Sequence, residues 1–373
     1  MALGQSIAEN NPGRQVDPYS QFSSAGRELE AYLNVIYNRY RMFDLRSEWM
    51  IRGVLKPRFV RMRGRLADYL KSFRGRYSFE TVGDETYLTI SASVTGERRQ
   101  NYRLHLALFL FTILTTLFVG SLREGGDPFV AAADLSLGVP FSAAIMLILL
   151  VHELGHYFAA RYHGMDVTLP YFIPLPPPFI FGTGGALIKM RSPMFSRRML
   201  LDVGAAGPIA GFVVSVPVLI IGLMSSQWSP VPSQYFVPGK SLLFSWLAER
   251  IVGPAPPGAF LQMSSVAFAG WIGFFVTAMN MLPIGQLDGG HIAYALFGRR
   301  HTRIAYAFFV LLLGLGYFWP GWFVWALMIL LLIRVKHPPI IDEDIPLDPR
   351  RKLIGAVTLI ILLLTFMPLP ILA

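Results

Sequence analysis

The chain has 373 residues, of which 53% are hydrophobic and only 15% charged, and its formal net charge is +10. Because a soluble globular protein carries about a quarter charged residues, this balance argues against a wholly soluble protein and indicates a polytopic membrane protein. The sequence contains no cysteine, which excludes disulfides, thiolate nucleophiles and thiolate metal ligands.

The first hundred residues have a different, water-soluble composition. Residues 1–103 carry 17 Lys and Arg against 11 Asp and Glu. We expect residues 1–24, which are rich in Ser, Gly, Asn and Pro, to form a disordered N-terminus. Residues 25–100 are expected to form a small α+β domain, ahead of a polytopic membrane domain at residues 101–373.

Local patterns predict the elements of the small domain. Apolar residues recur at helical spacing over Ala25–Phe43, which predicts a helix. The segment Phe59–Leu66 is interpreted as a strand. Tyr77–Val82 and Tyr87–Ser91 flank a short polar stretch and predict a hairpin.

A basic run lies within the same domain. The segment Arg52–Arg76 holds nine Lys or Arg and a single acid, Asp68. It is either a solvated face or a surface attracted to anionic lipid headgroups.

The rest of the chain consists of apolar segments near the length of about 20 residues that a membrane helix needs. The candidates are Leu104–Leu122, Leu137–Tyr162, Val203–Met224, the shorter Val266–Leu282, Ile304–Ile333 and Leu353–Leu372. One straight helix over Ile304–Ile333 would be about 45 Å long, too long for a hydrocarbon core of about 30 Å. Since Trp319-Pro320-Gly321 interrupts it and basic residues flank both ends, we expect a hairpin there. The fold class predicted is therefore a helical bundle of about seven transmembrane helices.

Charge between the spans predicts their orientation, because Lys- and Arg-rich loops face the cytoplasm. Arg123–Ser136 has one basic residue and three acids, and Ser225–Ser265 has two basic residues, whereas Arg161–Asp202 has five. We therefore expect the small domain to be cytoplasmic and the C-terminus extracytoplasmic.

The segment Thr168–Met190 does not fit this scheme. It contains five prolines and the Gly-rich stretch Gly182–Ala186, so it is too broken for a span and yet too apolar for a free loop. We expect a re-entrant segment, buried in protein beside a wet cavity that satisfies its backbone.

The second apolar segment contains three ionisable residues. His152 and His156 are four residues apart and share one helix face, so both imidazoles can reach one metal ion. Glu153 is placed to take a proton from a water molecule activated by that metal. This H-E-x-x-H pattern typically indicates zinc-dependent peptide hydrolysis. Two merely structural histidines are the less favoured interpretation, since ionisable residues in a span are costly and normally functional.

A zinc site of this kind needs a third protein ligand, with the fourth position left for water. His163 follows His156 by seven residues, where the longer zincin pattern requires six, so we interpret it as an interfacial residue. Asp166 falls beyond the expected helix end. Asp288 is the preferred candidate, because it lies at the cytoplasmic end of the fourth predicted span, on the side of the histidines. Taken alone, Asp288 is also compatible with an acidic cap of a helix beginning near Gly289.

The two motifs together resemble a known family. The pairing of His152-Glu153-Leu154-Gly155-His156 with Asn280-x-x-Pro283-x-x-x-Leu287-Asp288-Gly289 is similar to the site-2 protease family of intramembrane zinc metalloproteases, peptidase family M50. Gly207–Phe212 and Gly182–Ala186 also resemble that family, and the resemblance covers roughly residues 100–370.

Two further features indicate which branch of this family the chain resembles. The segment from His337 through Pro349 and the final span resembles the bacterial and plastid branch, which has an N-terminal soluble domain. Many bacterial relatives place a PDZ domain between the third and fourth spans. Ser225–Ser265 has only 41 residues, which is too short for such an insert.

The resemblance implies an activity and a site. His152, His156 and Asp288 would bind one Zn²⁺ per chain, Glu153 would be the general base, and Asn280 would lie next to the substrate or the developing oxyanion. The implied function is that of an intramembrane zinc metalloendopeptidase that cleaves transmembrane segments of membrane protein substrates, as in regulated intramembrane proteolysis. An extended substrate is expected to bind by strand addition at Gly184 and Gly185.

Two other functions are weighed against this one. A proteolytically inactive, metal-binding membrane scaffold would not need Glu153, because metal binding alone requires no base. A metal transporter would favour polar residues through successive spans, whereas the polar groups here converge on one site.

The expected partners are transmembrane protein substrates and the lipid bilayer, with no nucleic acid; the oligomeric state is left open. The expected location is a bacterial cytoplasmic membrane or, alternatively, a plastid membrane.

Overall fold

The computed structural model describes residues 33, 36–45, 48–70, 76–93, 100–191, 194, 196–231, 237–337, 340 and 346–372. The chain divides into two compact units between Gln100 and Asn101. The disorder predicted for residues 1–24 lies outside the described residues.

Among its described residues, the first unit contains an antiparallel sheet and the short helices α2 and α3. The strands are ordered β1-β2-β4-β3, with β1 Tyr37–Leu45, β2 Glu48–Leu55, β3 Arg76–Val82 and β4 Glu85–Ser93; the helices are α2 Pro57–Arg61 and α3 Arg63–Leu70. The predicted hairpin is confirmed as β3 and β4, in which Phe79 pairs with Leu88. Gly83 in the connecting turn has φ +59°, a conformation that glycine adopts without a steric penalty.

The helix predicted over Ala25–Phe43 is wrong in its second half, because β1 begins at Tyr37. A bulge between Tyr37 and Arg39 inserts one extra residue into this strand. Tyr37 and Tyr40 are consequently both buried although they are three residues apart. This spacing imitates that of a helix face. Residues 25–32 lie outside the described residues.

The strand predicted over Phe59–Leu66 is also wrong, since these residues belong to α2 and α3. Pro57 occupies the first turn of α2, where the fixed φ of proline suits a helix start. Leu66 and Leu70 are both buried and lie four residues apart, which is the spacing of one helix face.

The second unit is mainly helical. Its longer helices are α4 Tyr102–Arg123, α5 Val139–Tyr162, α6 Arg197–Leu223, α7 Leu242–Ile251, α8 Ser265–Asn280, α9 Asp288–Phe297, α10 His301–Leu315, α11 Gly321–Met328 and α12 Pro349–Thr365. The short turns η1 Ala132–Gly138 and η2 Gly298–Arg300 precede α5 and α10, and α11 continues into the π-helical turn η3 Ile329–Ile333. Among the described residues, α4, the stretch Ala132–Tyr162 and α6 are long and apolar enough to cross a membrane. The chain is therefore a membrane protein with a small sheet ahead of its helices.

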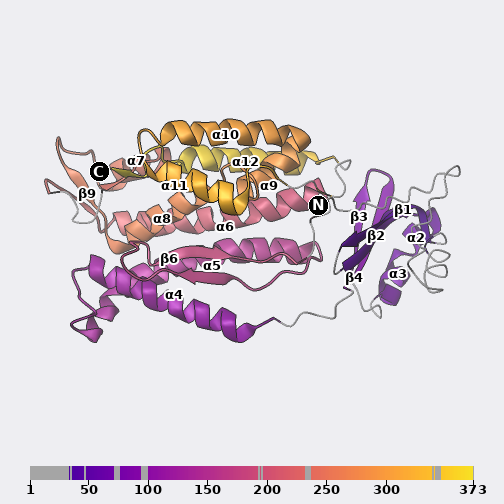
Figure 1. Ribbon diagram of the computed structural model, residues 1–373, viewed down its shortest axis with the longest axis horizontal. Helices are drawn as coiled ribbons and strands as arrows, with labels where there is room; N and C mark the ends of the chain where they lie inside the picture. The colour runs from indigo at the N-terminus through magenta and orange to yellow at the C-terminus, as the bar shows by residue number, and fades with distance from the viewer. Residues whose placement is uncertain are drawn as a thin grey trace. The chain divides into compact units, whose positions relative to one another are not determined.

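Helix α6 lies at the centre of this unit. It packs against α5 and α8 along most of its length, and also against α9 and α12 (Figure 1). Small residues permit the close approach: a Cβ added at Gly155 of α5 would lie 2.6 Å from the carbonyl oxygen of Ala206 in α6. The interface between these two helices is thus formed by nearly touching backbones.

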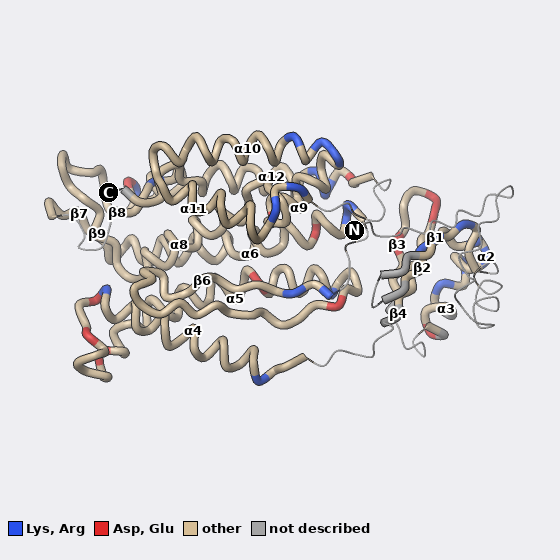
Figure 2. Tube along the Cα trace, in the orientation of Figure 1, with Lys and Arg blue, Asp and Glu red and all other residues tan. Residues whose placement is uncertain are grey.

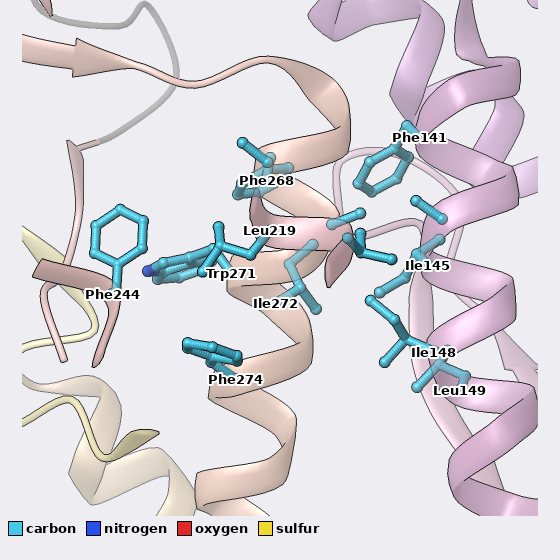
Figure 3. Packing of buried hydrophobic residues seen from close by; sticks show 14 of the residues in the cluster. Phe141, Ile145, Ile148, Leu149, Leu219, Phe244, Phe268, Trp271, Ile272 and Phe274 are labelled. Atoms are coloured by element: carbon cyan, nitrogen blue, oxygen red, sulfur yellow. The ribbon is translucent and has the colours of Figure 1, made fainter. Parts of the chain in front are cut away.

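One large hydrophobic cluster fills the space between α5, α6 and α8 (Figure 3). Its labelled side chains include Phe141, Ile145, Ile148, Leu149, Leu219, Phe268, Trp271, Ile272 and Phe274. The rings of Phe268 and Trp271 are stacked, with centroids 5.7 Å apart. Since Leu149 is followed within one helical turn by His152, this packing determines where the polar part of α5 lies.

A β-hairpin follows α5. Its strands, β5 Tyr171–Pro174 and β6 Thr183–Leu187, are antiparallel, with Phe172 opposite Ala186. The hairpin lies along α4: Thr115 Oγ1 donates to the carbonyl of Gly182 at 2.7 Å, and the His105 ring lies 4.0 Å from that of Tyr171. In the described part of the chain β6 is hydrogen-bonded to β5 alone, so its other edge faces no strand.

Two further small strand pairs join segments of the same unit. Strand β7 Gln227–Ser229 pairs with β9 Phe260–Gln262, and β8 Val237–Pro238 pairs with β10 Ile371–Leu372. The second pair brings the end of the chain to the connection between α6 and α8.

Candidate metal centre

Helix α5 places the two histidines of the H-E-x-x-H motif on one buried face. His152 and His156 are only 4% and 6% exposed, and their Nε2 atoms lie 3.2 Å apart. The regular helix produces this proximity, because residues four apart are stacked one turn above the other. The two rings thus direct their Nε2 atoms to the same point.

Asp288 reaches the same point from another part of the chain. It is the first residue of α9, after an irregular turn that follows the end of α8 at Asn280. Its Oδ2 atom lies 3.4 Å from Nε2 of His152 and 3.3 Å from Nε2 of His156. The structure therefore brings together the three residues predicted to bind metal.

The distances within this triangle match what zinc requires. Nitrogen and oxygen ligands at about 2.0–2.2 Å from a tetrahedral zinc ion lie about 3.3–3.5 Å from one another. The three edges here are 3.2, 3.3 and 3.4 Å, and His152, His156 and Asp288 form a group able to hold a metal ion. Two imidazoles and one carboxylate are also the donor set that suits zinc in a hydrolytic site.

A backbone carbonyl orients one of the imidazoles. Nδ1 of His156 lies 2.8 Å from the carbonyl oxygen of Val203 in α6. Because a carbonyl only accepts, Nδ1 must carry the proton, and the lone pair of Nε2 is left for a metal.

Two glycines of α6 make room for the histidines. A Cβ added at Gly207 would fall within 2.5 Å of three ring atoms of His156, and one at Gly211 would lie 2.9 Å from Nδ1 of His152. Each glycine therefore accommodates one ring. Gly207 and Gly211 are four residues apart and so lie on the same helix face as each other, matching the spacing of the histidines on α5.

Glu153 and Asn280 both lie next to the triangle. Glu153 is 5% exposed, and its carboxylate accepts a hydrogen bond from the backbone amide of Ile188, directly after β6. The side-chain nitrogen of Asn280 lies 3.4 Å from Nε2 of His152. The predicted base and the predicted oxyanion residue are thus both at the site.

The predicted substrate residues Gly184 and Gly185 lie in β6, before Ile188. The amide of Gly185 donates to Thr183 Oγ1 at 3.0 Å, and its φ is +93°. Their described hydrogen bonds run within the hairpin, and β6 connects them to the amide that contacts Glu153.

The two rejected ligand candidates have other partners. Nε2 of His163 lies 2.9 Å from Oδ2 of Asp202, and both carboxylate oxygens of Asp202 accept from the Arg351 guanidinium. Asp166 forms an ion pair with Arg191 at 3.8 Å. Neither belongs to the group able to hold a metal ion.

Several groups at the site were missed by sequence reasoning. The carbonyl of Val203 and the amide of Ile188 leave no sequence signal, because every residue supplies a carbonyl and all but proline supply an amide. Gly207 and Gly211 did leave one: two small residues four apart in an apolar helix permit close approach of another helix. Their contact with the histidines was not predicted.

Comparison with known proteins adds three relatives. Residues 140–315 match the sequence profile of peptidase family M50. The Arabidopsis thaliana protein named "Probable zinc metalloprotease EGY2, chloroplastic" is 30% identical over 70% of this chain and 48% of its own length. The EGY1 proteins of Arabidopsis thaliana and Oryza sativa subsp. japonica, with the corresponding name, are 32% and 31% identical over 65% of this chain, and over 44% and 42% of their own lengths. The chain spans about half the length of the curated relatives it matches. No solved structure matches.

Proposed function

Because this chain belongs to peptidase family M50, the site-2 protease family of zinc metalloproteases, we propose that it is a zinc endopeptidase that cleaves transmembrane segments of membrane proteins. The observation that carries the proposal is the triangle of His152, His156 and Asp288 with a buried carboxylate, Glu153, beside it.

The three ligands would hold one zinc ion per chain. Zinc at this position supplies Lewis-acid polarisation of the scissile carbonyl and a water molecule whose pKa is lowered to about 7. His156 is held for this role by the carbonyl of Val203, which keeps its metal-binding nitrogen unprotonated.

Glu153 moves the proton of the reaction. Its carboxylate accepts a proton from the attacking water and then delivers it to the nitrogen of the departing amine, so that the amine leaves neutral. The amide of Ile188 orients this carboxylate, because a hydrogen bond to one oxygen leaves the other available.

Asn280 stabilises the developing oxyanion. Its side-chain amide is a donor held next to His152, at the edge of the metal triangle. A donor preorganised at the place where negative charge develops stabilises the transition state more than the ground state.

The β5–β6 hairpin is a re-entrant segment that receives the substrate. A membrane helix must unwind before its peptide bond is accessible, and the unwound backbone then needs hydrogen-bond partners. The open edge of β6 offers them at Gly184 and Gly185 by strand addition. Since β6 leads directly to Ile188, a strand bound there runs toward Glu153.

We further propose that the chain crosses the membrane seven times, through α4, α5, α6, α8, α10, α11 with η3, and α12. Contacts between helix ends support this arrangement. Trp322 at the start of α11 donates to the carbonyl of Pro368 near the chain end, and β10 pairs with β8 after α6. At the opposite end, Arg351 of α12 pairs with Asp202 near the start of α6. By these contacts α12 runs antiparallel to α11 and parallel to α6, as an alternating seven-span arrangement requires.

Charge supports an inward-facing N-terminus and an outward-facing C-terminus. Figure 2 shows Lys and Arg gathered near one end of the helical unit, where α5 ends and where α6, α10 and α12 begin. Acidic residues lie at the other end, between α4 and α5. Because basic loops remain in the cytoplasm, the metal centre lies in the cytoplasmic half of the bundle.

The location in the cell is proposed from the relatives. A bacterial cytoplasmic membrane was the first expectation and a plastid membrane the alternative; the chloroplastic names of the relatives support the plastid alternative. The proposed partners are transmembrane protein substrates.

The Glu153→Gln variant tests the proposed activity. It retains both histidines and Asp288, so zinc content should be unchanged while cleavage falls by about 10²–10⁴-fold, the usual contribution of a general base. Quantitative proteomics of membranes that contain wild-type or variant protein should show fragments cut within spans for the wild type alone. Identical fragment patterns with normal zinc would instead favour the inactive scaffold.

A further inference from the structure

A cavity of about 610 Å³ lies next to the turn that carries Asp288 and is lined by none of the metal ligands. Its volume is within the range of about 300–1,000 Å³ that is usual for small-molecule sites. The proposed peptidase reaction makes no use of it.

The polar part of the lining is cationic. Arg334 and Lys336 line the cavity together with Gln286, and all three are exposed. No carboxylate in the described part of the chain pairs with either cation. Nζ of Lys336 lies 6.0 Å above the ring of Tyr306, a contact that holds the ammonium at the cavity. The site therefore favours an anion.

The rest of the lining is apolar and continuous with the outer surface of the helices. Phe309 of α10 and Leu330 of η3 line the cavity, and Leu330 is 56% exposed. Val310 and Leu331, their neighbours in sequence, are also exposed. In the proposed topology this surface faces lipid, and the two cations lie at its cytoplasmic end.

The backbone at Arg334 is held in an uncommon conformation. Arg334 has φ +65°, directly after the π-helical turn η3. Both π-helical turns and strained backbone occur often at functional sites. The amide of Gly285 donates to the carbonyl of Val335 at 3.0 Å, and a Cβ at Gly285 would collide with the carbonyl of Arg334. The strained segment is thus braced against the turn that leads to Asp288.

We propose that this cavity binds an anionic phospholipid, with the phosphate diester between Arg334 and Lys336 and an acyl chain along Phe309 and Leu330. The inference rests on the proposed function only in placing these helices in a membrane. An acyl chain suits a wall that continues into lipid-facing surface, and a negative headgroup suits two cations at the membrane boundary. Because the occupied cavity adjoins the Gly285 turn, the lipid would be bound beside the metal centre.

The test is native mass spectrometry of the full chain in detergent, titrated with palmitoyl-oleoyl phosphatidylglycerol, with the matching phosphatidylcholine, or with inorganic phosphate. Phosphatidylglycerol should bind at least tenfold more tightly than either of the others. The double variant Arg334→Asn with Lys336→Gln should lose about tenfold or more of this affinity. Asparagine is chosen because it tolerates the left-handed backbone of Arg334.

A charge-matched control is available on α12. Arg350→Gln with Lys352→Gln removes two exposed cations from the proposed cytoplasmic side without touching the cavity, so the affinity should stay within about twofold. An equal loss in this control would overturn the site in favour of diffuse charge attraction. Equal binding of phosphatidylcholine, or of phosphate alone, would overturn recognition of an anionic lipid. Glu153→Gln should bind lipid as the wild type does. Lipid binding can therefore be interpreted even if the peptidase assignment fails.

Discussion

The metal centre joins two regions that are built in different ways. His152 and His156 stand on α5, a regular helix whose hydrogen bonds are local and whose preceding turns are packed into the large hydrophobic cluster. Asp288 stands after an irregular turn that is braced by Val335 from much later in the chain. Two ligands are therefore aligned by one helix, whereas the third is available only after α6, α9 and the segment after η3 have packed. Metal affinity should therefore report tertiary assembly as well as ligand identity.

The largest expected effect comes from removing Asp288, the ligand that follows the irregular turn. Asp288→Ala should lower zinc affinity by more than about 100-fold, beyond the 10–100-fold typical of outer-shell partners, and should abolish cleavage. Metal content of the detergent-purified protein checks this. Glu249→Ala, which removes an exposed carboxylate on α7, serves as the control and should keep a full equivalent of zinc. If Asp288→Ala also kept it, Asp288 would not be the third ligand.

The next variant disturbs the position of a ligand on the regular helix α5 without replacing the ligand itself. Gly207→Ala places a Cβ within the volume of the His156 ring and should separate Nδ1 from the carbonyl of Val203. Zinc affinity, measured by competition with a chelator, should fall by about 10–100-fold. Gly314→Ala is the matched control, since a Cβ at this helical glycine meets no atom within 4 Å. Equal affinities in the two variants would show that α6 does not hold the ring.

The brace of the irregular turn gives a smaller effect. Gly285 and Gly298 have nearly the same positive φ, +56° and +58°, but of the two only Gly285 abuts another backbone carbonyl. The positive φ should cost each alanine variant about 1 kcal/mol or more of stability, and in Gly285→Ala the collision with the Arg334 carbonyl adds to this cost. Zinc affinity should fall about tenfold in Gly285→Ala alone. Parallel thermal unfolding and metal titration separate the two effects, and a zinc loss in both variants would refute the specific role of the brace.

The smallest effect is expected in the hairpin. Gly185 and Gly258 both have positive φ and open space around them, so alanine introduces the same kind of backbone strain at each. Gly185→Ala should reduce kcat/KM for a membrane substrate by about three- to tenfold with normal zinc, because β6 receives the substrate strand. Gly258→Ala should leave it unchanged. A hairpin variant with wild-type kcat/KM would remove the support for strand addition.

Sequence reasoning succeeded where one periodicity dominated. The hairpin β3–β4 and the apolar character of α4, α5 and α6 were predicted, and the structure confirms them. It failed at β1, where the bulge after Tyr37 produces a helix-like spacing of buried residues in a strand. It failed again at α2 and α3, where the start signal of Pro57 and the pair Leu66 and Leu70 were outweighed by a short alternating pattern.

The spacing of His152 and His156 was enough to place both on one face of a helix with Glu153 next to them in sequence, because helix geometry is a local property of the chain. The sequence also marked Asp288, because an acidic residue at the end of an apolar span is costly unless it is used, whereas Asn280 was indicated by the family resemblance. Only the tertiary structure decided that their atoms meet. The 3.2–3.4 Å triangle, the carbonyl of Val203 and the space left by Gly207 depend on how closely α5, α6 and α9 approach. That distance is set by packing between segments far apart in sequence, which no local pattern encodes.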